Sequence, residues 1–573
     1  MNPLFTKNPV ATALGLALLA AGATSMAQTL PDAGRLLQEQ QRGQPAAPAG
    51  SQAPRPAAPA PAALTALPAG ASVLVSAFEV SGVTLLPMTA VDAVLAPFKG
   101  KSLDFKQLSE AAEAVSRLYR SKGYLVARTY IPAQDIRPGT PVKLIVLEGK
   151  LAKTTVRPAA GTRMQAPKAQ AIFDNAMPTG QAITVERLER GLSLLSDWPG
   201  VEVSSVLSPG AQVGESDLTI DAKQDKLFSG AADVEPTGSP ASGKLRLGVS
   251  GFWSDPTGAG DQVSLRGSTT GYTHFVQAGY GTWLGNSGLR GQANLGLMKY
   301  TLCCEFSTAD QRGNAQSLGL SLSYPLIRLR ERNVFTTAQL DIRQLANDNI
   351  TGAVNRRKAN VLSLGTAADW SGNGWGASAG ATLAIGNIDL SGLAADQIAD
   401  AATANTQGGF RKISLNAAYS RAVNTQLSWT ASARGQLASK NLDSSETFGL
   451  GGTGGIKGYA GGEGVGDQGF LAMLEARYVA MPNVVLTGSV ECGQITLHKN
   501  TWAGWNASSP TLPNSYSLCG LGSTVDWTFA KDSNVKLTIG RRLTEGKLRQ
   551  ATGLDADGKA KDWHFGIMAM TRF

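Results

Sequence analysis

The stretch "QGFLAMLEARYVA" at residues 468–480 alternates two kinds of side chain, one residue at a time. One face carries only apolar and aromatic side chains: Phe470, Ala472, Leu474, Ala476 and Tyr478. The other face carries Glu475 and Arg477, whose charges need water. Successive side chains of a β-strand point to opposite faces. The stretch therefore predicts a strand with Glu475 and Arg477 facing a water-filled pore, and with lipid or an apolar core on its other side.

The same period of two returns elsewhere in the C-terminal part of the chain. Leucines alternate with serine and glycine in "SLGLSLSY" (317–324), and "WHFGIMAMTRF" (563–573) alternates through Phe565 and Ile567 to the terminal Phe573. Repeated alternation of this kind, without spanning helices, is typical of a transmembrane β-barrel, whose closure satisfies every backbone group. A large soluble β-sandwich is the alternative. The C-terminal residues argue against it, because Phe565, Ile567 and Phe573 resemble the signal that the barrel-assembly machinery reads.

The length of this region sets the expected number of strands. Residues 227–573 are rich in glycine, serine and threonine and form the predicted barrel. They number about 345, and a barrel strand with its turns and loops uses ~20 to 22 residues, so about 16 strands are expected. A barrel of that size encloses an aqueous lumen.

The N-terminus is typical of an exported protein. Lys7 precedes an apolar run from about Val10 to Ala21, and Ser25 and Ala27 form a small-residue cleavage pattern. These features predict a secretory signal peptide over residues 1–27. A membrane anchor is the alternative, and the shortness of the apolar run disfavours it.

A short helix is expected directly after the signal peptide, within residues 28–43. Asp32 is a candidate N-cap and Gly43 a candidate stop. The helix would carry Arg35, Leu36, Leu37 and Glu39. It buries too little to be stable alone, so it must dock on another part of the chain or be disordered. Residues 44–72 are dominated by proline and alanine and predict an extended, semi-stiff linker.

Two compact α+β modules are expected between the linker and the barrel, over residues 73–150 and 151–226. The first contains a predicted helix over 105–121, in which Asp104 and Gln107 have the spacing of a capping box. Short alternating strands surround this helix, and the second module repeats the plan. The alternative is that these are small folding modules that bind no ligand.

Composition and motifs exclude several classes of function. The formal charge of +9 is spread along the chain without a basic, aromatic-rich cluster, so no nucleic-acid partner is expected. No catalytic motif stands in a convincing context, and "GGTGG" (451–455) lacks the Lys-Ser/Thr of a phosphate-binding loop. The chain is therefore predicted not to be an enzyme. The three histidines have no metal-ligand spacing, and no cofactor is expected.

The four cysteines should lie in an oxidising compartment, where pairs are expected. A hairpin centred between Cys492 and Cys519 would set these two residues opposite each other on neighbouring strands, which favours a disulfide between them. Cys303 and Cys304 are adjacent. A vicinal disulfide, an intermolecular bridge and free thiols all remain open for that pair.

The order of signal, short helix, Pro-rich linker, two modules and barrel resembles the two-partner secretion transporters. This haemolysin/adhesin secretion-activator family belongs to the superfamily that combines a barrel with POTRA (polypeptide-transport-associated) domains. Four stretches carry the resemblance: "GYLVARTYIPAQDIRPGTPVKLIVLEG" (123–149), "DWPGVEVSSVLSPGAQVGESDL" (197–218), "YPLIRLR" (324–330) and "IKGYAGGEG" (456–464).

The resemblance implies a functional role for the glycine-rich segment 451–470, which would fold from outside into the lumen. The family motif at the loop tip is Val-Arg-Gly-Tyr or a close variant, and here it reads Ile456, Lys457, Gly458 and Tyr459. The family pairs its arginine with an aspartate on a later strand, and "GSVECG" (488–493) puts Glu491 in that place. Lysine lacks the fork of arginine, so a looser lock is expected. The alternative is that Lys457 is solvated.

The resemblance also implies a function of type V secretion. The barrel would lie in outer-membrane lipid after insertion by the barrel-assembly machinery, with both POTRA domains in the periplasm. These would bind an unfolded exoprotein through its N-terminal secretion domain, and the barrel would secrete it without ATP. The short helix would plug the lumen at rest. An outer-membrane insertase and a passive porin or uptake channel are the alternatives.

Overall fold

The computed structural model describes residues 31–42, 72–137, 139–224, 226–236, 240–304, 307 and 310–573. The expected signal peptide lies outside these residues, as does the expected linker apart from Ser72. No helix within the described ranges is both long enough and apolar enough to span a bilayer.

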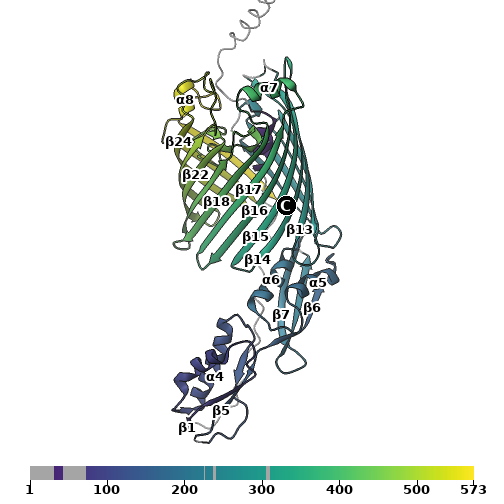
Figure 1. Ribbon diagram of the computed structural model, residues 1–573, viewed down its shortest axis with the longest axis vertical. Coiled ribbons are helices and arrows are strands. Elements are labelled where there is room, and N and C mark those ends of the chain that lie inside the picture. Colours follow the sequence, from purple (N-terminus) through teal and green to yellow (C-terminus); the bar gives the residue numbers. More distant parts are fainter. Residues whose placement is uncertain are drawn as a thin grey trace, which may run out of the picture.

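A closed antiparallel barrel of 16 strands forms the C-terminal part (Figure 1), which confirms the expected fold class and strand number. Neighbours along the chain pair with each other, and the last strand pairs with the first. The strands are β9 (Phe228–Pro236), β10 (Leu245–Ser254), β11 (Gln262–Thr269), β12 (Thr273–Trp283), β13 (Arg290–Thr301), β14 (Arg312–Arg328), β15 (Arg332–Asn349), β16 (Gly352–Gly372), β17 (Trp375–Asp389), β18 (Gly408–Ala422), β19 (Leu427–Ala438), β22 (Gln468–Met481), β23 (Val484–Thr496), β24 (Ser515–Ala530), β25 (Ser533–Arg542) and β26 (Trp563–Arg572).

Alternation along the strands separates the two surfaces of the barrel. In β22, Phe470, Leu474 and Tyr478 are 51%, 54% and 43% exposed on the outer surface, while Leu471 between them is buried. The barrel closes where β26 meets β9, and there the N–H of the terminal Phe573 donates to the carbonyl of Gly230 at 3.1 Å. An apolar outer surface with a closed hydrogen-bond ladder is what a lipid environment requires.

Two α+β modules follow one another below the barrel (Figure 1). Each has a three-stranded sheet, in the order β2-β5-β4 and β6-β8-β7, and the first also has the pair β1-β3. Their elements are β1 (Ser72–Val75), β2 (Phe78–Ser81), α3 (Met88–Leu95), η1 (Ala96–Phe98), β3 (Lys101–Asp104), α4 (Phe105–Ser121), β4 (Arg128–Tyr130), β5 (Val142–Leu147), β6 (Lys150–Pro158), α5 (Ala166–Ala176), α6 (Val185–Ser196), β7 (Val201–Pro209) and β8 (Glu215–Gln224).

The module helices begin where side chains cap them. The Asp104 carboxylate accepts from the backbone N–H of Gln107 at 2.7 Å, and the Gln107 side chain accepts in return from the N–H of Asp104. Thr184 caps α6 by accepting from the N–H of Arg187. Both caps satisfy backbone donors that a helix start leaves free.

Polar contacts bind the second module to the end of the barrel that faces it. Asp197, at the end of α6, accepts two hydrogen bonds from the Arg328 guanidinium of β14, at 2.7 and 2.9 Å. Arg190 of α6 donates to the carbonyl of Pro325 at 2.9 Å. A bidentate arginine–carboxylate pair fixes orientation as well as distance.

The remaining elements lie within the lumen or in the loops at the far end of the barrel. They are α2 (Ala33–Arg42), η2 (Pro240–Ser242), α7 (Ala394–Ala402), η4 (Ser444–Glu446), β20 (Phe448–Gly449), β21 (Val465–Gly466) and α8 (Lys547–Thr552). Helix α7 crowns the far end between β17 and β18 (Figure 1).

Candidate functional site

Among the residues that the structure describes, two segments occupy the lumen of the barrel: helix α2 and the long connection between β19 and β22, residues 439–467, which we call the inward loop. Together they obstruct the pore. The space left beside them is about 1020 Å³ and is lined by α2, the inward loop and the far half of β26.

Helix α2 docks on the barrel wall through its apolar face. Leu36 and Leu37 are only 2% and 1% exposed. They pack in one cluster with wall residues that include Phe275, Met298, Tyr300 and Leu345. The helix is too small to be stable alone, and this wall supplies the surface on which it folds.

Polar contacts tie α2 to three other elements along its length. The N–H of Ala33 donates to Oδ1 of Asn347 on β15 at 2.8 Å. Gln38 donates to the carbonyl of Thr447 at 3.0 Å, and the Gln40 side chain accepts from Ser268 of β11 at 2.8 Å. Of the residues expected on the helix, Arg35 and Glu39 pair with each other at 3.4 Å.

The inward loop carries its tip residues to the opposite wall. The N–H of Lys457 donates to Oε2 of Glu491 at 2.7 Å, and its ammonium forms an ion pair with the same carboxylate. The ammonium also reaches Ser489 at 3.3 Å and Glu475 at 3.4 Å. The Glu491 side chain is fully buried and that of Lys457 is 10% exposed, so the lysine is not solvated. The structure thus brings together the tip lysine and the two predicted glutamates.

Tyr459 fixes the loop at a second point. Its hydroxyl lies within hydrogen-bond distance of the carbonyl oxygens of Cys519, at 3.1 Å, and Thr544. The guanidinium of Arg542 stands over the tyrosine ring, 5.4 Å from its centroid. Ile456 is buried in an apolar cluster between the loop and the strands β22, β23 and β24. The whole tip is therefore seated against the wall.

Glycines on the wall make room for the tip, a feature that the sequence interpretation missed. A Cβ at Gly520 would lie 2.7 Å from Cγ2 of Ile456, and one at Gly522 would lie 2.6 Å from Cδ of Lys457. A Cβ at Gly458 would in turn lie 2.5 Å from the carbonyl carbon of Arg541. These approaches are closer than real Cβ contacts, so glycine is needed on both sides.

A disulfide braces the wall next to this lock. Cys492 and Cys519 are directly opposite each other in the register of β23 and β24, and they are joined. Cys492 follows Glu491 directly, and Cys519 offers its carbonyl to Tyr459. The structure also joins Cys303 to Cys304, the first of the three possibilities that the sequence left open.

The other predicted residues lie away from this lock. Arg477 lies two residues beyond Glu475 in β22 and is exposed. The residues expected to guide barrel assembly are on the outer surface near the seam: Phe565, Ile567 and Phe573, 73%, 55% and 62% exposed.

A cluster of buried charges at the far end of the lumen was not predicted from the sequence. The carboxylate of Glu446 in η4 is held by Arg343 and by Lys412, the latter at 2.7 Å. Asp443 accepts from Arg357 of β16 at 2.8 Å and from the N–H of Ser445 at 3.0 Å. Burial raises the pKa of both carboxyls, but their cationic and hydrogen-bonding partners lower it by a larger amount. The net shift of each pKa is therefore downward. Both acids are therefore charged.

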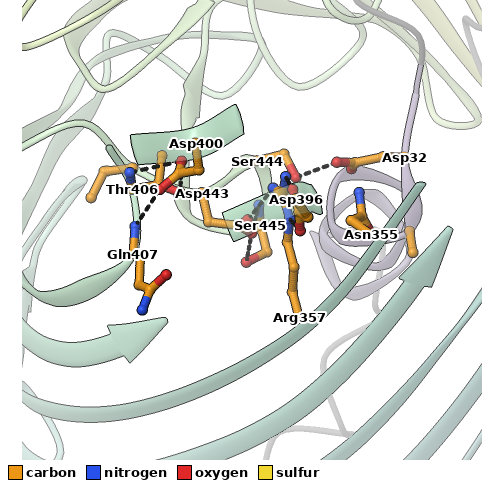
Figure 2. A network of polar contacts seen from close by, with 12 residues as sticks. Asp32, Asn355, Arg357, Asp396, Asp400, Thr406, Gln407, Asp443, Ser444 and Ser445 are labelled. Atoms are coloured by element: carbon orange, nitrogen blue, oxygen red, sulfur yellow. Dashed lines mark hydrogen bonds and ion pairs between the residues drawn. The ribbon is translucent and has the colours of Figure 1, made fainter. Parts of the chain in front are cut away.

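The segment that this cluster holds is residues 441–448, which we call the saddle of the inward loop because α2 rests on it. Asp32 at the start of α2 accepts from the Ser444 hydroxyl at 2.7 Å (Figure 2). A Cβ on Gly34 would lie 2.8 Å from that hydroxyl oxygen, so the helix and the saddle are in close contact. Helix α2 and the inward loop form one packed assembly inside the barrel.

Two family profiles match this chain. The family described as "Haemolysin secretion/activation protein ShlB/FhaC/HecB" matches residues 214–501, half of the chain. The family described as "POTRA domain, ShlB-type" matches residues 73–149. The first match runs from the second module through the inward loop to the wall strand that carries Glu491.

Named relatives and a solved structure agree with these matches. "Heme/hemopexin transporter protein HuxB" of Haemophilus influenzae (strain 86-028NP) is 24% identical over 462 residues, 78% of this chain and 80% of that protein. "Outer membrane transporter CdiB" of Dickeya dadantii (strain 3937) is 23% identical over 432 residues, 73% of this chain and 75% of that protein. The structure of CdiB from Escherichia coli superposes with a TM-score of 0.70 at 19% identity, covering 96% of this chain and all of that one.

Proposed function

The chain belongs to the haemolysin secretion/activation protein family ShlB/FhaC/HecB, and we propose that it carries an unfolded partner exoprotein from the periplasm to the cell surface or medium. The chain is an outer-membrane transporter of the two-partner secretion type, with its POTRA modules in the periplasm. The observation that carries the proposal is the obstructed pore. A barrel of 16 strands whose lumen holds two segments of its own chain, α2 and the inward loop, suits a conduit that opens only for its substrate.

Recognition would begin at the edges of the module sheets. In the first module β2 and β4 are the edge strands, and in the second module β6 and β7 are. Edge strands present unpaired backbone groups to which an extended chain can add as a further strand. β7 also exposes Val206, which is 51% accessible, beside that edge. An unfolded exoprotein with an N-terminal secretion domain fits such a surface.

Passage through the barrel would require both obstructions to rearrange. Helix α2 would act as a plug that leaves the lumen, and the inward loop would shift while its tip stays locked by Lys457 and Glu491. Export would proceed without ATP, because folding of the exoprotein outside the cell can bias its movement. Phe565, Ile567 and Phe573 would serve earlier, as the signal for barrel assembly.

The division of the chain follows from this proposal. Residues 1–27 would be removed as a signal peptide, 28–43 would be the plug and 44–72 its linker. Residues 73–150 and 151–226 would be the two POTRA domains, and 227–573 the barrel. The linker of ~28 residues reaches ~85 Å when extended, enough to connect a plug inside the barrel with the first module.

Deleting the chain from its host tests the proposal, with mass spectrometry of the medium, the cell surface and the outer membrane as the readout. We expect one large exoprotein to disappear from outside the cell and to return when the wild-type chain is restored. Depletion of many barrel proteins from the outer membrane would favour an insertase instead. A changed uptake of small solutes with unchanged secretion would favour a porin.

A further inference from the structure

Helix α7 lies outside the barrel mouth and contains two buried acids with separate partners. Asp400 serves its own loop, since its carboxylate accepts from the N–H groups of Thr406 and Gln407, both at 2.9 Å (Figure 2). Asp396, 8% exposed, points instead to the barrel wall. On the other side of the helix Ile398 is 71% exposed to the exterior. Asp396 therefore links α7, whose opposite side is exposed to the exterior, to the barrel wall.

Arg357 of β16 binds Asp396 of α7 and also binds the saddle inside the lumen. Its Nε and Nη2 donate to the two oxygens of Asp396 at 3.2 and 3.0 Å, and its Nη1 donates to Asp443 of the saddle at 2.8 Å. A guanidinium is rigid and planar, so the positions of the two carboxylates depend on each other.

The saddle carries the connection to the plug. The Asp443 carboxylate accepts from the N–H of Ser445 at 3.0 Å and fixes the turn of η4. The neighbouring Ser444 donates to Oδ2 of Asp32 at 2.7 Å, and Oδ1 of Asp32 caps α2 by accepting from the N–H of Arg35 at 2.9 Å. Contacts thus run without a break from α7 to the cap of α2 (Figure 2).

A second anchor of the saddle behaves differently. Glu446 is held by Arg343 of β15 and Lys412 of β18, and both of these cations belong to the barrel wall. That anchor keeps the saddle attached to the barrel, and within the described part of the chain neither cation pairs with α7. Of the cations in these two anchors, Arg357 is the one that also pairs with α7; the saddle residue Asn441 in addition donates to the carbonyl of Ala404, just after α7, at 2.8 Å.

We propose that Arg357 is a positioning residue through which α7 sets how firmly the plug helix is held. This inference rests on the proposed function, in which α2 closes the resting pore. Removing the guanidinium would leave Asp443 buried without its cation and Asp32 facing a like charge. Burial and the nearby Asp443 raise the pKa of Asp32, and the N–H of Arg35, the Ser444 hydroxyl and the charge of Arg357 offset only part of this rise. Movement of α7 would then loosen α2.

Hydrogen exchange of the full-length protein, reconstituted in lipid, tests the inference directly. The variants are Asp396→Asn, which removes the ion pair between α7 and Arg357 but leaves the Arg357–Asp443 pair, and Arg357→Gln, which removes both ion pairs. Arg357→Lys is the conservative rescue. The control is Arg356→Gln, also on β16, which removes the more exposed pair of Arg356 with Asp348 of β15 at 2.5 Å.

We expect α2 amides to exchange about tenfold faster in Asp396→Asn and Arg357→Gln, because a lost buried ion pair shifts a local opening equilibrium by at least this factor. Amides of the wall strands should not change. Arg357→Lys should restore part of the protection, and Arg356→Gln should match the wild type. Channel recordings should show a parallel rise in open time.

Unchanged α2 exchange in Asp396→Asn would overturn the inference, as would an equal effect in Arg356→Gln. Exchange in α2 reports only how the helix is seated, so these outcomes leave the proposed function standing. Conversely, a wild-type chain that secretes no exoprotein would overturn the proposed function without altering the exchange result. The two failures are therefore distinguishable.

Discussion

Lys457 at the tip of the inward loop binds Glu491 of the wall twice, through its backbone N–H at 2.7 Å and through its ammonium. The backbone bond places the loop, and the ion pair neutralises a carboxylate that is fully buried. A buried charge that loses its partner is costly, whereas an exposed pair contributes little. The strength of the loop lock should therefore reside in Glu491 and not in the neighbouring Glu475.

Glu491→Gln should weaken the lock by about 3 kcal/mol, because it leaves the buried Lys457 ammonium without its main partner. Glu475→Gln is the matched control. That carboxylate is 3.4 Å from the ammonium and 32% exposed, so its loss should cost under about 1 kcal/mol. Hydrogen exchange of the loop amides measures both changes. Equal effects of the two substitutions would contradict the assignment.

The lysine–glutamate pair should be interchangeable with arginine–aspartate, the pair implied by the family resemblance, only as a unit. Lys457→Arg should crowd the wall at Gly522, where Cδ of the lysine already lies close, and Glu491→Asp should open a gap. The double variant should recover about 1–3 kcal/mol relative to the sum of the singles. A double-mutant cycle on loop exchange measures this coupling. Additive effects would show that the two positions act independently.

The inward loop should be held less firmly as the pH rises through neutrality. Burial raises the pKa of Glu463 to about 7, with Asp555 and Asp557 also raising it and Arg542 and the N–H of Ala556 opposing. A folded-state pKa above the ordinary value gives stability that is complete below about pH 4.5 and is lost as the pH passes 7.

Glu463→Gln isolates this effect because it removes the titration and keeps the shape. Loop exchange in the wild type, divided by that in Glu463→Gln at each pH, should rise by up to about a hundredfold between pH 5 and pH 8. The size corresponds to about 2–3 kcal/mol at most. A ratio that stays flat with pH would show that Glu463 does not titrate in this range.

The disulfide Cys492–Cys519 should stabilise the wall, since it closes a loop with a sequence separation of 27 residues. Replacing both cysteines by serine should cost about 3 kcal/mol on the chain-entropy account. The double replacement of Cys303 and Cys304 is the control, because their separation of 1 closes no comparable loop. The midpoint of heat unfolding in detergent measures both. A larger loss from the control pair would contradict this account.

The helices and strands that could be predicted are those with a clear local pattern in the sequence. Helix α4 spans Phe105–Ser121 as expected, because Asp104 and Gln107 satisfy its first backbone donors within four residues. The strand number followed from the period of two and the length of the region. Helix α5 (Ala166–Ala176) was missed, since its buried stripe of Ala169, Ile172 and Phe173 is too short to stand out.

The polar part of the site could not be predicted in the same way. Arg357 and Asp443 are 86 residues apart in sequence, and Asp32 and Ser444 are 412 apart. No local sequence pattern around these four residues indicates which distant residue each one contacts. Lys457 and Glu491 could be paired only through the family motif. The wall glycines next to the loop tip look like ordinary strand residues in the sequence, and their role is visible only in the folded structure.

Ion conductance in planar bilayers tests the central claim, that the transporter is a pore closed at rest by α2. The intact protein is compared with a variant that lacks residues 28–72. The account predicts little conductance from the intact protein and large, steady channels from the deletion. Equal conductance from both would contradict it, because α2 would then not be the resting seal.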